Sequence, residues 1–402
     1  MLLKIKHLSI FLFLFGFQMI AALQANGECT CELLTQSEEN DQKVVAMAQE
    51  IESSFNNNSV DGFNDNFDLD SFKSLIINNI DISSNNAYIE GFLDGVGDAG
   101  NKLATKILFE IQNGAYYNLI NFQYNIIEKA YYFTFRIYSE TTGINYHDYK
   151  VCSNGEEIRV NDIYIYLSGE HISETLNRLL KMSLEDENNN TYDSEESMVS
   201  SITRVINAQK LAQEGKPKEA YKEINAITGP LKKEKFFLLL KALFASAYDD
   251  KIYEDILSEF ADLYPNDPTL YLKMIDYYFL KENYKMTHIY IDKLMFETDD
   301  DFLYLMKARA YMLQEDYANA EKHFNYIKRN YPSNFEAYIG EMISLTFLNR
   351  LEDTLAIAQS LVDLGYDKEE LTVYFEEKEP DGSNTLESFV ESDIYKEWKQ
   401  KS

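Results

Sequence analysis

The sequence predicts two differently built halves: an α+β domain first, and then an all-α array of helix pairs. Between residues 115 and 168, apolar and polar residues alternate, which is typical of β-strands with one buried face. From about residue 198 the apolar spacing becomes helical, and Pro265 and Pro332 stand 67 residues apart. That separation is twice a period of about 33.5 residues, which indicates a repeated pair of helices.

The bulk composition sets limits on size and partners. A chain of 402 residues with 45% apolar residues is long enough for two or three domains with sizeable cores. Its formal net charge of −30 repels polyphosphate and anionic lipid headgroups. We therefore expect neither nucleic acid nor a membrane surface as a partner, and the simplest role of the charge is solubility.

Residues 1–25 have the pattern of a secretory signal peptide. Lys4 and Lys6 precede the apolar run LSIFLFLFGFQMIAAL, and small residues follow it, so that cleavage after Ala25 or after Gly27 fits about equally well. A retained signal anchor is the alternative, although the run is short for a membrane span. We expect an exported protein, periplasmic or extracellular, and the abundant Asn, Ile and Lys are typical of an AT-rich bacterial genome.

The three cysteines are Cys29, Cys31 and Cys152. Export permits disulfides, and one cysteine of the Cys-Thr-Cys pair can bond Cys152, which leaves an odd thiol. Glu28 stands where a lipid-attachment signal needs a small residue, which argues against a lipoprotein. The cysteine spacing and the scarcity of histidine argue against a metal site, and we expect no cofactor.

The N-terminal half is predicted to begin with a polar segment at 26–66, which contains one helix, QKVVAMAQEIESSF, and ends in an Asn-rich loop. The α+β domain follows at 67–183. Its helices are predicted in FDLDSFKSLIINNI, NKLATKILFEIQNG and, at its end, HISETLNRLLKMSL. Its four strands are predicted in AYYNLINFQYNI, KAYYFTFRIYSE, INYHDYKVC and EIRVNDIYIYLS. Short connections between the strands predict an antiparallel meander.

Gly95, Gly97 and Gly100 form a formal GxGxxG motif in the stretch GVGDAGNK. A dinucleotide site needs a strand directly before this motif and a helix directly after it. The preceding stretch, SSNNAYIEGFLD, is more typical of a helix or loop. We therefore interpret the glycines as a bend between two helices.

The stretch from His147 to Glu170 is rich in side chains that could do chemistry. His147 and Asp148 are adjacent on a strand, so they point to opposite faces and cannot act as a catalytic pair. The helices and meander, ending in VNDIYIYLSGEHISETL, resemble the NTF2-like α+β cone. That resemblance implies a pocket, with His147, Asp162 and Tyr166 as the residues expected to line it. In some proteins of that superfamily the pocket binds a small ligand, and in some it is catalytic.

An acidic linker at 184–197 is expected to lead into about five repeats at 198–367, with starts near 201, 234, 268, 301 and 335. In the register that starts at Asp301, the small and aromatic signature positions are Ala308, Tyr311, Ala320, Phe324 and Pro332. This part resembles a tetratricopeptide-repeat (TPR) array, although Tyr253, Thr287 and Thr354 stand where a small alanine is usual. Residues 368–402 are predicted to be capping helices, with Phe389, Ile394 and Trp398 packed on the array.

The TPR resemblance implies a concave groove lined by the first helix of each repeat. The groove residues are then Leu272, Asp276, Phe279, Phe302, Leu305, Arg309, Met312, Ile339, Ile343 and Phe347. Such a mostly apolar surface suits an extended or helical segment of another protein. The alternative is that the N-terminal domain or the C-terminal helices already fill the groove.

We therefore expect an exported, non-enzymatic scaffold or adaptor that binds a protein partner through the repeat groove. The competing hypothesis is a small-ligand or enzymatic pocket in residues 67–183, for which the repeats serve as a scaffold.

Overall fold

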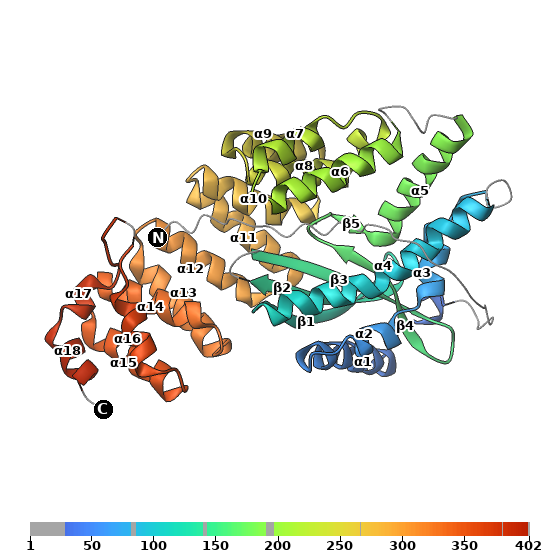
Figure 1. Cartoon of the computed structure of the whole chain (residues 1–402). Coiled ribbons are helices and arrows are strands. Elements are labelled where there is room, and N and C mark those ends of the chain that lie inside the picture. The colour runs from blue at the N-terminus through green and yellow to red at the C-terminus, as the bar shows by residue number, and fades with distance from the viewer. Residues whose placement is uncertain are drawn as a thin grey trace. The chain divides into compact units, whose positions relative to one another are not determined.

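The computed structural model describes residues 29–400 apart from 82–85, 140–142, 190–196, 266 and 380. The predicted signal peptide and both of its cleavage positions lie outside the described residues, as does half of the predicted acidic linker. Helices and a five-stranded antiparallel meander come first, and an all-α array of paired helices follows, which confirms the predicted fold class (Figure 1). The chain divides between Lys273 and Met274 into two compact units, here named the N-terminal unit and the C-terminal unit.

The sheet has the strand order β1-β2-β3-β4-β5, and each neighbouring pair is antiparallel. The strands are β1 (Tyr116–Asn125), β2 (Ala130–Ser139), β3 (Gly143–Ser153), β4 (Ile158–Ile165) and β5 (Glu170–His171). The first four are the predicted strands. The two-residue β5, which pairs His171 with Tyr164, was not predicted because it is too short to show an alternating pattern.

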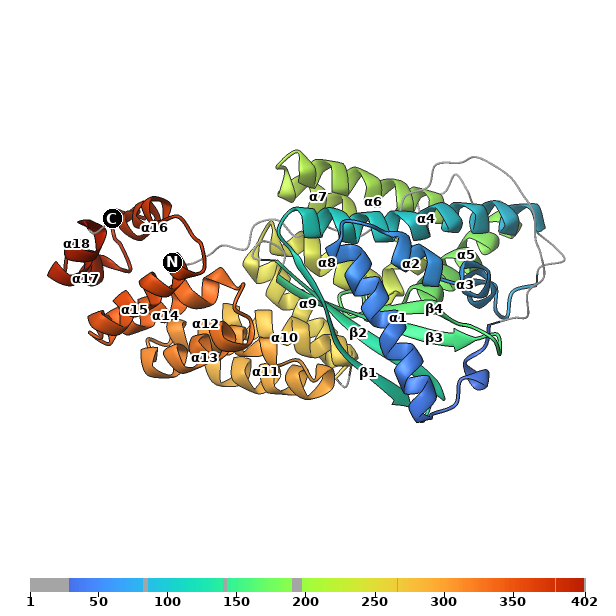
Figure 2. The ribbon, with the colours of Figure 1, turned by 90° about the horizontal axis from the view of Figure 1, so that it is seen from below.

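Six helical segments accompany the sheet in the N-terminal unit. They are η1 (Cys31–Leu33), α1 (Glu38–Asn56), α2 (Asp61–Asn66), α3 (Leu69–Ile76), α4 (Asn86–Gln112) and α5 (Ile172–Asn189). The helix α1 begins at its cap Ser37, whose hydroxyl accepts a bond from the amide of Asn40. Figure 2 shows α1 crossing β1 and β2. There its apolar stripe, which includes Val44 and Ile51, packs with Phe133 of β2 in one core.

Two local predictions in this unit are wrong. The glycine motif is not a bend, because α4 continues through it without interruption. At Gly97 the nearest side chain is that of Leu69 in α3, so the small residue lies where two helices approach each other. The Asn-rich stretch is not entirely a loop either, because α2 forms within it and buries Phe63. Tertiary packing overrides weak local helix preference at both places.

The array consists of five helix pairs. They are α6 (Met198–Gln213) with α7 (Pro217–Asn225), α8 (Lys235–Ser246) with α9 (Asp250–Leu263), α10 (Pro268–Leu280) with α11 (Tyr284–Thr298), α12 (Tyr304–Leu313) with α13 (Tyr317–Asn330), and α14 (Phe335–Phe347) with α15 (Leu351–Asp363). Two short 3-10 helices, η2 (Pro230–Lys233) and η3 (Asp301–Leu303), precede α8 and α12. The predicted repeat starts lie within a few residues of these pairs. Thr287 and Thr354, which replace the usual small residue, are buried and bond the carbonyl four residues earlier.

Three further helices close the chain: α16 (Lys368–Glu376), α17 (Glu387–Val390) and α18 (Asp393–Gln400). Phe389 and Trp398 are buried as predicted, and the indole of Trp398 donates to Gln359 of α15 at 2.8 Å. Ile394 is only half-buried, whereas its neighbour Tyr395 is buried. Tyr395 and Trp398 are three residues apart, so they share the face of α18 that packs inward.

No helix among the described residues is both long enough and apolar enough to cross a membrane.

Candidate functional site

His147 lies in a buried hydrogen-bonded group of side chains. Its Nδ1 is 3.1 Å from the hydroxyl of Tyr117, which in turn lies 2.6 Å from the hydroxyl of Tyr149. The Nε2 of His147 is 3.3 Å from the side-chain nitrogen of Asn145. Burial lowers the pKa of His147 to about 4, so the imidazole is neutral at pH 7. These contacts position the ring within the core.

Asp162 links β4 to the start of α5. Its Oδ1 accepts bonds from the amides of Ile163, at 2.9 Å, and Ser173, at 3.2 Å. Its Oδ2 accepts the hydroxyl of Ser173 at 2.5 Å. Ser173 is the second residue of α5, and amides in the first turn of a helix have no carbonyl acceptor within the helix. The carboxylate of Asp162 supplies the missing acceptor for the amide of Ser173. Burial raises the pKa of Asp162, and these bonds oppose that change.

The structure does not bring the three predicted pocket residues together. His147 pairs with Phe135, and both side chains lie on the face of the sheet that the N-terminal helices cover. Lys150, three residues further along β3, points to the opposite face and pairs there with Asp162. Tyr166 is on that second face too, with its ring 5.4 Å from that of Tyr146. His147 therefore does not share a space with Asp162 and Tyr166.

A polar cluster joins the meander to the first helix pairs within the N-terminal unit. Arg178 of α5 forms ion pairs with Glu170 and with Glu234, the residue before α8. Lys235 donates to the carbonyl of Gly169 and to Asp267. The sequence did not reveal this cluster, because its members come from four separated segments and form no motif.

A second contact in the same unit ties β4 to the start of α10, where the hydroxyl of Tyr164 lies 3.2 Å from that of Thr269. With the charged cluster, this contact ties the meander to the start of α8 and to the start of α10, and all of these residues belong to the N-terminal unit. The division between the two compact units comes after Lys273, just beyond these residues in the chain.

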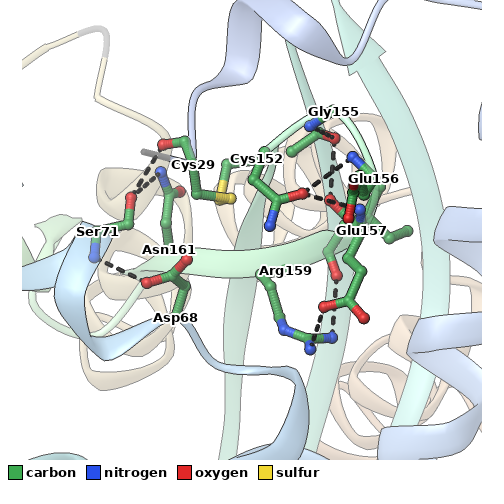
Figure 3. The surroundings of a disulfide bond; sticks show 12 residues. Cys29, Asp68, Ser71, Cys152, Gly155, Glu156, Glu157, Arg159 and Asn161 are labelled. Atoms are coloured by element: carbon green, nitrogen blue, oxygen red, sulfur yellow. Dashed lines mark hydrogen bonds and ion pairs between the residues drawn. A yellow bond between two sulfur atoms is a disulfide. The ribbon is translucent and has the colours of Figure 1, made fainter. Parts of the chain in front are cut away.

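The disulfide joins Cys29 to Cys152, so one cysteine of the Cys-Thr-Cys pair bonds Cys152 as predicted (Figure 3). The main chain on either side supports it, because Thr30 pairs with Ser153 and the hydroxyl of Ser71 donates to the carbonyl of Cys29. Both bridged cysteines are buried. A buried disulfide is compatible with export.

The disulfide also argues against two other roles for Cys29, which are lipid attachment and metal binding. Its sulfur is bonded to Cys152, so it is not free to carry a lipid thioether. The carboxylate of Asp68 lies close to both sulfurs, but sulfurs bonded to each other are not thiolate ligands for a metal. Cys31 is the free thiol, and burial is the main reason that its pKa is raised.

The predicted groove residues fall into two groups. Five are buried: Leu272, Phe302, Leu305, Ile339 and Ile343. The last two belong to the core that also contains Phe389 and Trp398 of the C-terminal helices, and Met312 packs against the same core. This arrangement favours the alternative in which those helices fill part of the groove. The other five, Asp276, Phe279, Arg309, Met312 and Phe347, are partly or fully exposed.

Arg309 has its partner within the chain. Its guanidinium makes two bonds of 2.5 Å to the carboxylate of Glu336 on α14. Such a bidentate pair fixes both side chains, so Arg309 ties two neighbouring helix pairs together.

Apolar side chains remain exposed at the end of the first helix in three successive pairs. Leu280, Leu313 and Phe347, here named the apolar row, are 44%, 42% and 51% exposed. Each ends its helix at the turn into the second helix of the pair. The ring of Phe347 also stacks on Tyr317 at 4.4 Å. Of the three, only Phe347 was named as a groove residue from the sequence. Leu280 and Leu313 occupy the same position, 12 residues after the predicted starts at 268 and 301, so the repeat register already pointed to them.

No family model, curated protein or solved structure matches this chain.

Proposed function

We propose that this chain is an exported, non-enzymatic scaffold, and that its helix pairs bind an apolar segment of a partner protein. The observation that carries the proposal is the apolar row. Single exposed apolar residues are ordinary on protein surfaces. Here, however, they recur at spacings of 33 and 34 residues, at equivalent helix ends, and each is more than 40% exposed. Recurrent exposed apolar positions are typical of an interaction surface.

The row covers only the turn end of the groove that the TPR resemblance implies. Several groove residues are buried in this chain, so the proposal moves the contact surface toward the turn end of each first helix. Phe347 belongs both to the predicted groove and to the row. The groove residues Phe279 and Met312 directly precede the row residues Leu280 and Leu313 in the sequence. The helix pairs resemble TPR units in period and in their small-residue positions, and that family's use as a binding scaffold supports this role.

Charge defines the partner further. Residues 274–402 contain 26 Asp and Glu against 14 Lys and Arg, which gives a net charge of −12. Glu282 and Glu315 stand in the turns beside Leu280 and Leu313. We infer a partner segment that combines spaced apolar side chains with lysine or arginine, because opposite charge speeds association and disfavours acidic competitors.

The test compares capture by the wild-type chain with capture by Leu313→Asp and Phe347→Asp. The matched control is Val373→Asp, at a position that is 72% exposed in the same unit but outside the row. Capture is done from the envelope fraction of the source cells with chemical crosslinking, and crosslinked peptides are identified by mass spectrometry.

The proposal requires that partner peptides crosslink beside the row, that both row variants lose them at least tenfold, and that the control keeps them. Equal circular dichroism melting curves would show that all three variants are folded. If the row variants capture the same proteins as the wild type, the row is not the binding surface.

A further inference from the structure

A ladder of aromatic rings crosses α11, α12 and α13 in the C-terminal unit. The ring of His323 lies between two tyrosine rings, 5.1 Å from Tyr304 and 5.4 Å from Tyr311, and nearly parallel to both. His288 continues the ladder 4.2 Å beyond Tyr311. Desolvation and nearby lysines lower the pKa of His323 to about 4, so this ring is uncharged at neutral pH.

A pocket of about 540 Å³ opens at the end of the ladder, lined by the rings of Tyr304, His323 and Tyr326. That volume is within the range of small-ligand sites. Asn325 and Asn330 also line it, and their amide nitrogens donate to Glu341 and to the carbonyl of Tyr326, which fixes these side chains. The walls therefore combine flat apolar rings with immobilised amides.

Two cations, Lys322 and Arg329, complete the lining. The carboxylates of this region are already bonded: Asp301 accepts the hydroxyls of Tyr326 and Tyr331, Asp292 pairs with Lys307, and Glu341 pairs with Lys328. Within the part of the chain that the structure describes, neither Lys322 nor Arg329 has an ion-pair partner. Both cations are exposed to solvent, and they line the same pocket on a chain with a net charge of −30.

We propose that this pocket binds a small acid whose carboxylate is carried on a six-membered ring, that is, an aromatic acid or a sugar acid. Arg329 and Lys322 would bind the carboxylate by charge-assisted hydrogen bonds. The ring of the ligand would pack against Tyr304 and Tyr326, as both aromatic and pyranose rings do. The site is separate from the apolar row, and it does not depend on the scaffold proposal.

The first test uses the purified chain and isothermal titration calorimetry at low salt. Benzoate and glucuronate are the acidic probes, and benzamide and glucose are their neutral counterparts. We expect at least one acid to bind saturably and at least tenfold more tightly than its neutral counterpart. The acid that binds more tightly identifies the ring as aromatic or pyranose.

Variants locate the binding. The double variant Lys322→Ala/Arg329→Ala should bind the acid at least tenfold more weakly, whereas Lys285→Ala, an exposed lysine of α11, should not change it. Tyr304→Leu should weaken binding and Tyr304→Phe should preserve it, because the ring is the contacting group.

Any of the following results would overturn the proposal: no saturable binding of either acid, undiminished binding by the double variant, or equal affinity for the neutral probes. Inorganic phosphate provides a final comparison. If it binds as tightly as the better acid, the ring has no part in recognition and the assigned ligand class is wrong.

Discussion

The hydroxyl of Tyr117 lies 3.1 Å from Nδ1 of His147, and both side chains are buried between the sheet and the N-terminal helices. Since burial holds the pKa of His147 at about 4, the folded chain resists a proton that the unfolded chain accepts near pH 6.5. Protonation therefore favours unfolding. The consequence is a dependence of stability on pH that originates in the core.

The first prediction concerns that dependence. Above pH 6.5 the histidine is neutral in both states and has no effect; as the pH falls from 6.5 toward 4, only the unfolded state gains the proton and stability is lost. The loss for this one group is roughly 3 kcal/mol. His147→Gln should be less stable than the wild type at pH 7 but should lose less stability on acidification. Urea unfolding at pH 7 and pH 4.5, followed by circular dichroism, measures both differences.

The control for this experiment is His288→Gln, because His288 is only half-buried. Its removal should change the pH dependence less. An identical loss of stability in the wild type and in His147→Gln would contradict the assignment. Asp162 and Glu170, whose pKa values burial raises, act in the opposite direction, and His323, whose pKa is also lowered to about 4, acts in the same direction as His147. All three groups are present in the wild type and in both variants, so they cancel in the comparison.

The second prediction uses two helical glycines. A Cβ on Gly340 would lie 2.4 Å from the ring of Phe324, whereas a Cβ on Gly97 would meet Leu69 at an ordinary 3.5 Å. Gly340→Ala should cost roughly 1–3 kcal/mol through overpacking. Gly97→Ala should gain about 0.5–1 kcal/mol, because alanine favours the helix. Thermal melts of both variants provide the measurement, and a stabilised Gly340→Ala would show that the helices can separate without cost.

The third prediction separates a structural role of Asp162 from a chemical one. Asp162→Ala leaves the amide and hydroxyl of Ser173 without their acceptor, and we expect a loss of about 2–3 kcal/mol. Asp162→Asn keeps one amide oxygen and should lose about half as much. Combining Ser173→Ala with Asp162→Ala should add little further loss, because the two residues share the contact. Fully additive losses in denaturant unfolding would argue that they act separately.

The fourth prediction concerns the disulfide. Cys29→Ser should lower the free energy of unfolding by about 2–5 kcal/mol, since the bridge closes a long loop with a sequence separation of 123 residues. Cys31→Ser should change it little, because that thiol is not bonded. Unfolding with and without reductant checks this. A reductant that leaves the wild type unchanged, or an equal loss in both variants, would speak against the pairing.

The sequence predicted the architecture because the two periodicities that encode it are strong. In β2, Phe133 and Phe135 alternate with Thr134 and Arg136, and this pattern places the two rings on one face of the strand. The helix pairs were predictable for the same reason. Ala308, Ala320 and Phe324 stand at the small and aromatic positions that are typical of a repeated helix pair, and all three are buried. The predictions failed where a contact distant in sequence decides the outcome, as at Gly97, where α3 approaches the middle of α4.

The candidate sites were less predictable. Strand register decides whether His147 and Asp162 share a face, and register depends on pairing that a single strand does not encode. Burial of Ile339 and Ile343 depends on the core that the C-terminal helices share. The pocket beside Tyr304 was missed because Lys322 and Arg329 look like ordinary surface charges in the sequence. Only the structure shows that they line one pocket and that the nearby carboxylates are bonded to other residues.

The pairing of Cys29 with Cys152 also constrains the order of events during biosynthesis. A ribosome releases Cys29 and Cys31 together, whereas Cys152 follows Cys29 by 123 residues. An oxidant that acts early would therefore join the two neighbours first. Reaching the native bridge then requires one thiol–disulfide exchange after β3 has been made, in which the Cys152 thiolate attacks the sulfur of Cys29 and Cys31 leaves as a thiolate. We therefore expect a catalyst of thiol–disulfide exchange to speed the folding of this chain, whereas an oxidant alone would leave the two neighbouring cysteines bonded to each other.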